Sequence, residues 1–270
     1  VLAADGVVRQ DIRSSFGSSA TVVDGVPLTL EFTVVDATGG CAPVPGVAVY
    51  AWHCSPDGLY SMYSQGAENE NYLRGVQVTD ADGVARFTTV FPGCYAGRWP
   101  HVHLEVYADE ASALAATDLI VTTQLAFTKA ASESVYADER YPGSMSNLGR
   151  LSLSSDMVFG DDGGVHELGA FTGDVSAGYV GRLTFGVDPS VRTAPGGDGF
   201  GAGGPMGPGG PGGGTGAPVN FDKMIAGNEF LEYAGVFGKR YGTPKKWVMD
   251  QLANGKLVID GINVVKKHAK

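Results

Sequence analysis

Residues 1–190 are predicted to form an all-β fold, an antiparallel β-sandwich. Short segments of alternating or mostly apolar residues recur along this region, separated by turn signals rich in Gly, Asp and Pro. The segment 27–36 alternates with a period of two residues, which in a strand buries one face and exposes the other. The segment from Ala130 to Asn147 shows no clean period, so we expect a loop there that includes a single helical turn. The other expected strands are 46–53, 84–90, 101–107, 118–127 and 179–187.

The composition limits the partners that the chain can have. Its 270 residues carry a net charge of −10, which argues against nucleic acid as a partner of the whole chain. No apolar run approaches about 18 residues, so we expect no membrane-spanning segment. No basic-then-apolar leader opens the chain, and we expect any signal peptide to be absent from it. The three cysteines, Cys41, Cys54 and Cys94, permit one disulfide and one free thiol, with the pairing left open.

The charge changes sign near residue 218. Residues 219–270 carry nine Lys or Arg and five Asp or Glu, a net charge of +4, whereas the preceding residues have a net charge of −14 and a single lysine. A stretch built mainly of Gly and Pro separates the two regions, and it cannot bury enough apolar surface to offset its ordering entropy. We therefore predict a β-sandwich at 1–190, a disordered linker at 191–218 and a small α/β-like or disordered tail at 219–270.

A candidate metal site surrounds a His-x-His pair. His101 and His103 lie two residues apart in an expected strand, so both side chains point to one face while Val102 points to the core. Such a pair alone is often two half-exposed histidines, and a third histidine would indicate zinc or copper. Tyr95 adds a hard oxygen donor that suits ferric iron. Arg98 is suited to stabilising an anionic oxygen on a bound substrate.

Several segments together resemble the intradiol ring-cleavage dioxygenases, most of all secreted actinobacterial-type members. The resemblance spans roughly residues 5–190, and its segments follow the family's order. They are Val49-Tyr-Ala-Trp-His-Cys54, Asp57-Gly-Leu-Tyr-Ser61, Phe91-Pro-Gly-Cys-Tyr95 and Arg98-Trp-Pro-His-Val-His103. The resemblance implies the β-sandwich fold of that family and, from its secreted members, an extracellular location.

The resemblance also implies a mononuclear, non-haem Fe(III) centre. The metal ligands would be Tyr60, Tyr95, His101 and His103. Arg98 and Gln124 would steady the ring-derived anion and the oxygen-bound intermediate, and Tyr95 would act in turn as ligand and proton acceptor. The substrates would be a catechol-type molecule and O2. The ring would open between the two hydroxyl-bearing carbons, giving a cis,cis-muconate-type diacid.

Two departures from the family pattern concern the substrate pocket. Family members usually begin with a Thr-(Ile)-Glu-Gly-Pro-Tyr/Phe-Tyr segment that helps to wall the pocket. Here residues 1–6 run almost directly into residues 7–13, so that wall is expected to be missing. The loop from Tyr95 to His101 is also shorter than in protocatechuate-type members.

Three other side chains near the motifs have ordinary interpretations. With four ligands already assigned, His53 is expected to pack beside the site rather than to bind metal. For Tyr63 and Trp99, a place in the pocket wall and simple packing both stay open.

The tail resembles pieces of two further families. Residues 219–254 resemble the nucleoside-monophosphate-binding part of guanylate kinases. The positions that would hold GMP are Glu232, Tyr241 and Thr243. The chain contains no Gly-x-x-x-x-Gly-Lys-Ser/Thr loop, so kinase activity is not expected. Residues 255–270 resemble part of a bacterial large-subunit ribosomal protein, and we expect a helix near 245–254 with little independent stability.

Three hypotheses of function follow. The leading one is an intradiol dioxygenase. The second is a β-sandwich binding module without activity, which the missing pocket wall motivates. The third is nucleotide or RNA binding by the basic tail. They differ in that only the first requires both bound Fe(III) and turnover.

Overall fold

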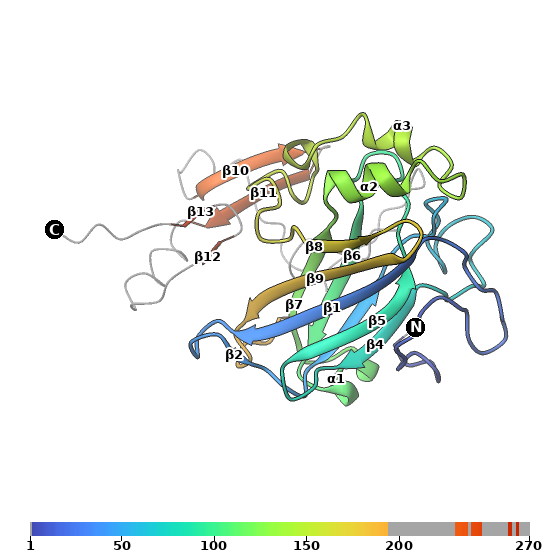
Figure 1. Cartoon of the computed structure of the whole chain (residues 1–270). Helices are drawn as coiled ribbons and strands as arrows, with labels where there is room; N and C mark the ends of the chain where they lie inside the picture. Colours follow the sequence, from blue (N-terminus) through green and yellow to red (C-terminus); the bar gives the residue numbers. More distant parts are fainter. Residues whose placement is uncertain (1, 194–229, 237–238, 245–258, 261–262, 265–270) are drawn as a thin grey trace. The chain divides into compact units, whose positions relative to one another are not determined.

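Strands in the N-terminal part of the chain build two sheets (Figure 1). One sheet has the order β4 (Arg74–Val78), β3 (Ala48–Trp52), β6 (His101–Tyr107) and β7 (Leu119–Ala126), and every neighbouring pair is antiparallel. The other has the order β2 (Ala42–Pro43), β1 (Pro27–Asp36), β9 (Gly178–Val187) and β8 (Ala170–Asp174), with β5 (Val84–Val90) also paired to β1. The structure, a computed structural model, describes residues 2–193, 230–236, 239–244, 259–260 and 263–264.

The main hydrophobic core lies between these sheets. In β1 every second residue is buried, as its sequence alternation predicts. The same alternation in β6 turns three residues toward this core. The core residues from the two strands are Leu28, Leu30, Phe32 and Val34 of β1, and Val102, Leu104 and Val106 of β6. Two sheets joined by one apolar layer confirm the predicted β-sandwich.

Two sequence predictions need correction within this fold. The strand β1 runs parallel to β9, so the second sheet is mixed rather than wholly antiparallel. The stretch predicted as a loop contains two helices, α2 (Lys129–Val135) and α3 (Ser144–Leu148). In α2 the buried positions are few and mostly small, Ala131, Ser132 and Val135, so its hydrophobic period is too faint to detect. The remaining short helices are α1 (Glu110–Ala115) and the 3-10 turn η1 (Leu153–Ser155).

The tail forms a second unit. Contacts divide the chain into Val1–Met206 and Gly207–Lys270. In the second unit β10 (Phe230–Val236) pairs with β11 (Lys239–Pro244), and β12 (Ile259–Asp260) pairs with β13 (Asn263–Val264), both antiparallel. The helix predicted near 245–254 and nearly all of the predicted linker lie outside the described residues. The predicted domain boundaries therefore stay predictions.

Two further predictions concern cysteines and membranes. All three cysteines are free thiols, with Cys41 exposed and Cys54 and Cys94 buried. Burial raises the pKa of the Cys94 thiol to about 12, so this thiol is protonated at neutral pH. Within the described segments, no helix has both the length and the apolar character needed to cross a lipid bilayer.

Candidate metal centre

Two histidines begin β6 on the same face of the sheet. His101 and His103 are only 3% and 6% exposed, while Val102 and Leu104 between and after them face the core. The predicted orientation of the pair is confirmed. Because β6 lies between β3 and β7, the imidazoles project from the middle of a sheet. Their burial distinguishes them from a pair of half-exposed surface histidines.

Two tyrosines reach the histidines from separate loops. Tyr60 lies in the loop between β3 and β4, and Tyr95 in the loop between β5 and β6. The loops approach each other at Gly58, which has a φ of 85° and would place a Cβ 3.1 Å from the Cβ of Tyr95. A glycine therefore allows the first loop to turn closely against the second.

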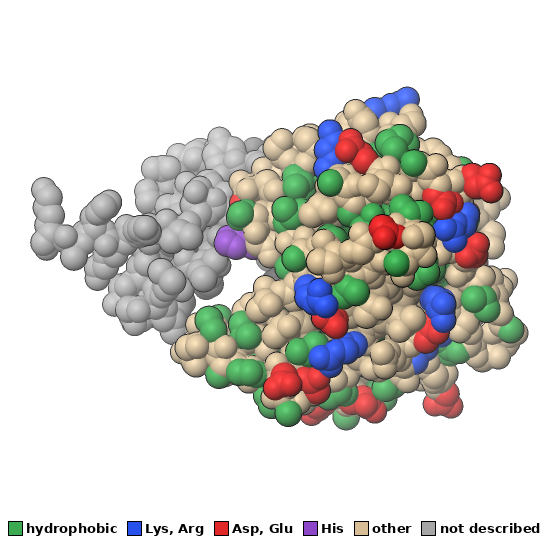
Figure 2. Space-filling model, in the orientation of Figure 1, with side chains coloured by type: hydrophobic (Ala, Val, Ile, Leu, Met, Phe, Trp, Pro, Cys, Tyr) green, Lys and Arg blue, Asp and Glu red, His purple; other side chains and the backbone are tan. Residues whose placement is uncertain are grey.

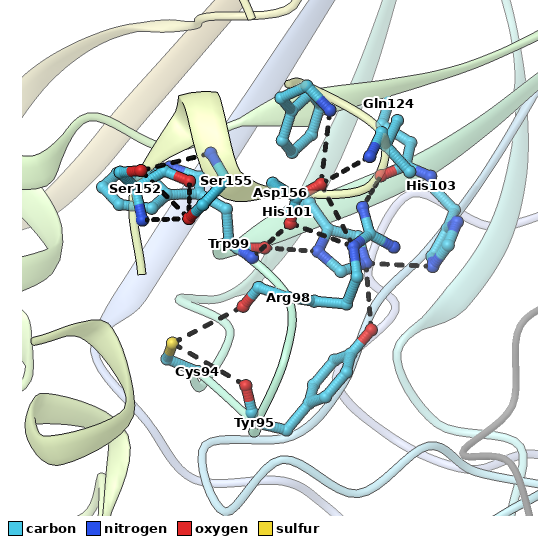
Figure 3. Close-up of polar contacts among 12 residues, drawn as sticks. Cys94, Tyr95, Arg98, Trp99, His101, His103, Gln124, Ser152, Ser155 and Asp156 are labelled. Atoms are coloured by element: carbon cyan, nitrogen blue, oxygen red, sulfur yellow. Dashed lines mark hydrogen bonds and ion pairs between the residues drawn. The ribbon is translucent and has the colours of Figure 1, made fainter. Parts of the chain in front are cut away.

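The polar atoms of these four side chains meet at one point. The Nε2 atom of His101 lies 3.2 Å from the hydroxyl of Tyr60, 3.3 Å from that of Tyr95 and 3.1 Å from Nε2 of His103. Figure 3 shows Tyr95 and His103 directed toward His101. The structure thus brings together all four residues that the sequence assigned as ligands, with Tyr60 coming from a different loop.

The protonation of the histidines suits metal binding. The Nδ1 atom of His101 lies 2.5 Å from the carbonyl oxygen of Trp99, so Nδ1–H donates there and Nε2 presents its lone pair to the site. Burial, followed by the Arg98 guanidinium, holds the pKa of His101 well below its usual range. Burial does the same to the pKa of His103. Both imidazoles are therefore neutral at physiological pH, as metal ligands must be.

The two phenols respond to burial in the opposite direction. Burial raises the pKa of Tyr60 well above its usual range and that of Tyr95 to about 12. A cation beside the phenol oxygens would offset this shift by stabilising the phenolates. The single lone pair of His101 Nε2 cannot satisfy three polar neighbours, whereas a cation can accept an electron pair from each of the four side chains.

The donor types fit ferric iron. Two imidazoles and two phenols combine nitrogen and hard oxygen donors, and tyrosine is a known ligand of iron. Zinc or copper would be favoured by a third histidine, but both ring nitrogens of His53 are already bonded, to the Cys54 carbonyl at 2.8 Å and the Thr89 hydroxyl at 2.7 Å. No group of three or more His, Cys, Asp and Glu suited to a metal occurs among the residues the structure describes, so a metal site there depends on tyrosine.

An arginine and a glutamine flank the four donors. Nη2 of Arg98 donates to Oε1 of Gln124 at 2.7 Å, and Nε of Arg98 forms an ion pair with Asp156 at 3.0 Å. Gln124 is buried on β7, where it is the register partner of His103. The guanidinium is thereby fixed at two points next to the histidine strand (Figure 3).

Asp156 is a site residue that sequence reasoning missed. Its side chain is fully buried, and beyond Arg98 it accepts hydrogen bonds from the backbone N–H groups of Trp99 at 2.6 Å, Val158 at 2.8 Å and Phe159 at 3.2 Å. It therefore ties the segment after η1 to the loop before β6. No local pattern marks this aspartate, because its partner Arg98 lies 58 residues earlier in the chain.

Three further side chains lie close to the motifs in the sequence: His53, Trp99 and Tyr63. His53 is buried and packs, as expected. Trp99 is buried too, and its Nε1–H donates to the Phe127 carbonyl at 2.7 Å, so it packs in the main core. Tyr63 is 43% exposed and lies over the guanidinium of Arg74.

The N-terminal segment runs beside β4. The Val76 N–H donates to the Val7 carbonyl at 2.9 Å, and the Arg9 N–H donates to the Val76 carbonyl at 3.1 Å. Leu2 and Phe16 pack against the apolar cluster that contains Tyr60. This short segment is therefore part of the surroundings of the tyrosine loop, although the family's wall sequence is missing from it.

Comparison with known proteins agrees with the fold. A protein-family model described as "Dioxygenase" matches residues 15–133. The chain is 33% identical over 129 residues to catechol 1,2-dioxygenase 1 of Acinetobacter lwoffii, a match covering 41% of this chain and 39% of that protein. It also superimposes on an intradiol ring-cleavage dioxygenase from Tetranychus urticae with a TM-score of 0.57 and 24% identity, covering 69% of this chain and 89% of that one.

These likenesses define the fold of the N-terminal part of the chain, which is the fold of the intradiol dioxygenases. The segment 15–133 carries the dioxygenase family match, and the predicted resemblance to intradiol ring-cleavage dioxygenases is confirmed. The chain spans about two fifths of the length of its catechol 1,2-dioxygenase relative.

A short fragment of the chain resembles a second family. It is 57% identical over 44 residues to a guanylate kinase of Carboxydothermus hydrogenoformans, covering 16% of this chain and 22% of that enzyme. The predicted guanylate kinase resemblance is thus confirmed for a fragment only. The resemblance of residues 255–270 to a ribosomal protein stays a prediction.

Proposed function

We propose that this protein is a non-haem Fe(III) dioxygenase. It would cleave a catechol-type ring with O2 between the two hydroxyl-bearing carbons and release a cis,cis-muconate-type diacid. The observation that carries the proposal is the convergence of four side chains. The hydroxyl oxygens of Tyr60 and Tyr95 and Nε2 of His103 all lie 3.1–3.3 Å from Nε2 of His101. The family match and the fold support the same class of reaction.

The four side chains would hold the iron. When bound, Fe(III) would supply positive charge that favours loss of a proton from the catechol and makes the ring reactive toward O2. The neutral imidazoles donate through Nε2, and the tyrosines donate as phenolates, which balance part of the ferric charge. The Trp99 carbonyl fixes the donating nitrogen of His101.

The two tyrosines differ in burial, and this difference supports a role of Tyr95 in proton transfer. Tyr60 is only 2% exposed and held among apolar side chains, whereas Tyr95 is half-buried and lies next to an exposed turn, Ala96-Gly97. A substrate arriving from solvent would meet Tyr95 first. In this proposal the Tyr95 phenolate takes a proton from one catechol hydroxyl, while Tyr60 stays in place.

Arg98 and Gln124 would stabilise the charge that develops on the ring. Asp156 and Gln124 hold the Arg98 side chain, which is only 12% exposed. A fixed cation in such a water-poor place stabilises an anionic intermediate more than the neutral ground state.

The test combines metal analysis with turnover. The purified full chain should contain close to one iron per molecule, show a visible tyrosinate band and take up O2 with catechol. An iron-loaded protein that consumes no O2 with any catechol would support the inactive binding module instead. A colourless protein without iron would overturn the proposal.

An extracellular location is a further part of this proposal, supported by the resemblance to secreted members.

A further inference from the structure

Arg74, at the start of β4, is a buried cation that has no acidic partner among the described residues. Its side chain is among the largest that are fully buried, with 1% exposed. Across the described part of the chain, the ion pairs within 4 Å include none to Arg74. Burying a charge lowers stability unless strong partners offset the cost. Its neutral hydrogen-bond partners therefore suggest a role other than an ion pair.

The guanidinium divides its hydrogen bonds between two segments. On one side, Nε donates to the Ser61 hydroxyl at 3.0 Å and Nη2 donates to the Ser61 carbonyl at 2.8 Å. On the other side, Nη1 donates to the Tyr50 hydroxyl at 3.1 Å. The ring of Tyr63 covers the guanidinium, 4.7 Å from its central carbon. Every acceptor is neutral, and the planar fork holds them in a fixed arrangement.

The first side leads directly to one of the candidate ligands. Ser61 follows Tyr60 in the chain, and its hydroxyl also donates to the Tyr72 carbonyl at 2.7 Å. Arg74 binds both the hydroxyl and the backbone of this serine. The backbone that carries Tyr60 is therefore fixed to the start of β4.

The second side leads to another candidate ligand through stacked rings. The Tyr50 ring stacks on Trp52 with a centroid distance of 4.8 Å, and Trp52 stacks on His103 at 4.7 Å and an interplanar angle of 7°. The sheet register also places Trp52 between Arg74 and His103, since Trp52 pairs with Arg74 on β4 and with His103 on β6. By binding the hydroxyl of Tyr50, Arg74 restrains the first ring of this stack.

We propose that Arg74 is a positioning residue that sets Tyr60 and His103 at the separation the metal requires. The inference rests on the proposed function, because it concerns the same four donors. A single guanidinium links the residue after a loop ligand to the ring stack on a strand ligand, and no other described side chain hydrogen-bonds to both Ser61 and Tyr50. The Arg74 side chain hydrogen-bonds to none of the four candidate ligands, so its bonds to Ser61 and Tyr50 carry its positioning role.

The experiment compares Arg74→Met with the parent in the full chain. Methionine fills a similar volume without the fork, so Tyr60 and His103 lose their common restraint. We expect iron to bind about 10–100-fold more weakly in competition with a chelator. We also expect the visible tyrosinate band to shift or weaken, because it reports the geometry of the phenolate at the metal. Arg74→Lys keeps the charge, but an ammonium group cannot bind Ser61 and Tyr50 together. Its iron affinity should therefore fall at least about tenfold.

Thr79→Val is the control. Thr79 follows the other end of β4 and is also buried, and its hydroxyl donates to the Val44 carbonyl at 2.8 Å and accepts from the Val47 N–H at 3.2 Å. This variant should lower Tm while the iron affinity and the band stay as in the parent.

The outcomes separate this inference from the proposed function. A parent without iron and colour would overturn both. A coloured parent whose band and affinity persist in Arg74→Met, or in Arg74→Lys if the methionine variant fails to fold, would overturn the role of Arg74 alone. An equal loss of affinity in Thr79→Val would also overturn it, because the effect would then be general destabilisation.

Discussion

Gln124 and His103 are direct partners across β7 and β6, and the amide of Gln124 accepts a 2.7 Å hydrogen bond from Arg98. A candidate ligand and a candidate anion-stabilising pair are therefore placed by one row of the sheet. Side chains opposite each other in neighbouring strands project from the same face.

The row extends across all four strands of this sheet. From β4 to β7 its members are Arg74, Trp52, His103 and Gln124. Strands in a sheet are more rigid than loops, so they give the site a fixed side, while Tyr60 and Tyr95 approach from loops. The tyrosine loops should therefore be where the site is most sensitive to small changes in backbone geometry.

The first prediction concerns Arg98. In Arg98→Ala the four donors are unchanged, so iron content and the tyrosinate band should remain, while turnover falls by about 10²–10³-fold because the developing anion loses its donor. Metal analysis, visible absorption and O2 uptake with catechol measure the three quantities. Turnover at the parent rate would show that Arg98 has no role in the chemistry.

The second prediction concerns His101, whose Nε2 is the atom that the other three donors surround. His101→Ala should lose iron and colour together. His53→Gln is the control, because His53 is an equally buried histidine bonded to Cys54 and Thr89 instead. The assignment of the centre would be wrong if His101→Ala retained iron with an unchanged spectrum.

Much of the candidate site was predictable because its signals are local. The spacing of His101 and His103 fixes a common face in any strand, and the alternation in 27–36 fixes which residues of β1 are buried. The short motifs around Tyr60 and Tyr95 carry the resemblance to a known family. These features depend on residues close together in the chain.

The features that were missed depend on distant partners. The carboxylate of Asp156 acquires a role only when folding brings it to Arg98, 58 residues away, and Arg74 meets Tyr50 across 24 residues. The direction in which β1 and β9 pair is likewise set by the path of the intervening chain. Side-chain periodicity gives the face that a strand buries, but not its neighbour or its direction.

The third prediction concerns Asp156. Asp156→Asn keeps the shape of the side chain but removes the charge that orients Arg98, so kcat should fall about 10–100-fold while iron and colour remain. Asp138→Asn is the control, since Asp138 pairs with Arg140 at 2.8 Å on a more exposed surface. An unchanged kcat in Asp156→Asn would show that Gln124 alone is enough to orient Arg98.

The fourth prediction concerns the tail. A chain that ends at Thr193 should keep the iron, colour and turnover of the full protein, because every candidate site residue lies before that point. Ending at Val187 should keep turnover but lower Tm, since it removes the 2.7 Å hydrogen bond from the Thr193 N–H to the Leu119 carbonyl. Turnover lost on ending at Thr193, with the fold intact, would show that the tail takes part in catalysis.

The last prediction uses two glycines that differ in one respect. Gly58 and Gly66 both have positive φ, 85° and 87°, and both lie in the loop that carries Tyr60. Alanine at either position should cost about 1–2 kcal/mol of folding free energy through backbone strain. A Cβ at Gly66 would meet nothing within 4 Å, whereas one at Gly58 would lie 3.1 Å from the Cβ of Tyr95.

Only Gly58→Ala should therefore disturb the metal centre. The added methyl pushes the two tyrosine loops apart, and the phenol of Tyr95 moves relative to His101. We expect a shifted or weakened tyrosinate band and lower iron affinity in Gly58→Ala, with the parent spectrum in Gly66→Ala and a similar fall in Tm for both. Identical spectra in the two variants would mean that the loops adjust without moving Tyr95, and that strand β6 alone determines the geometry of the site.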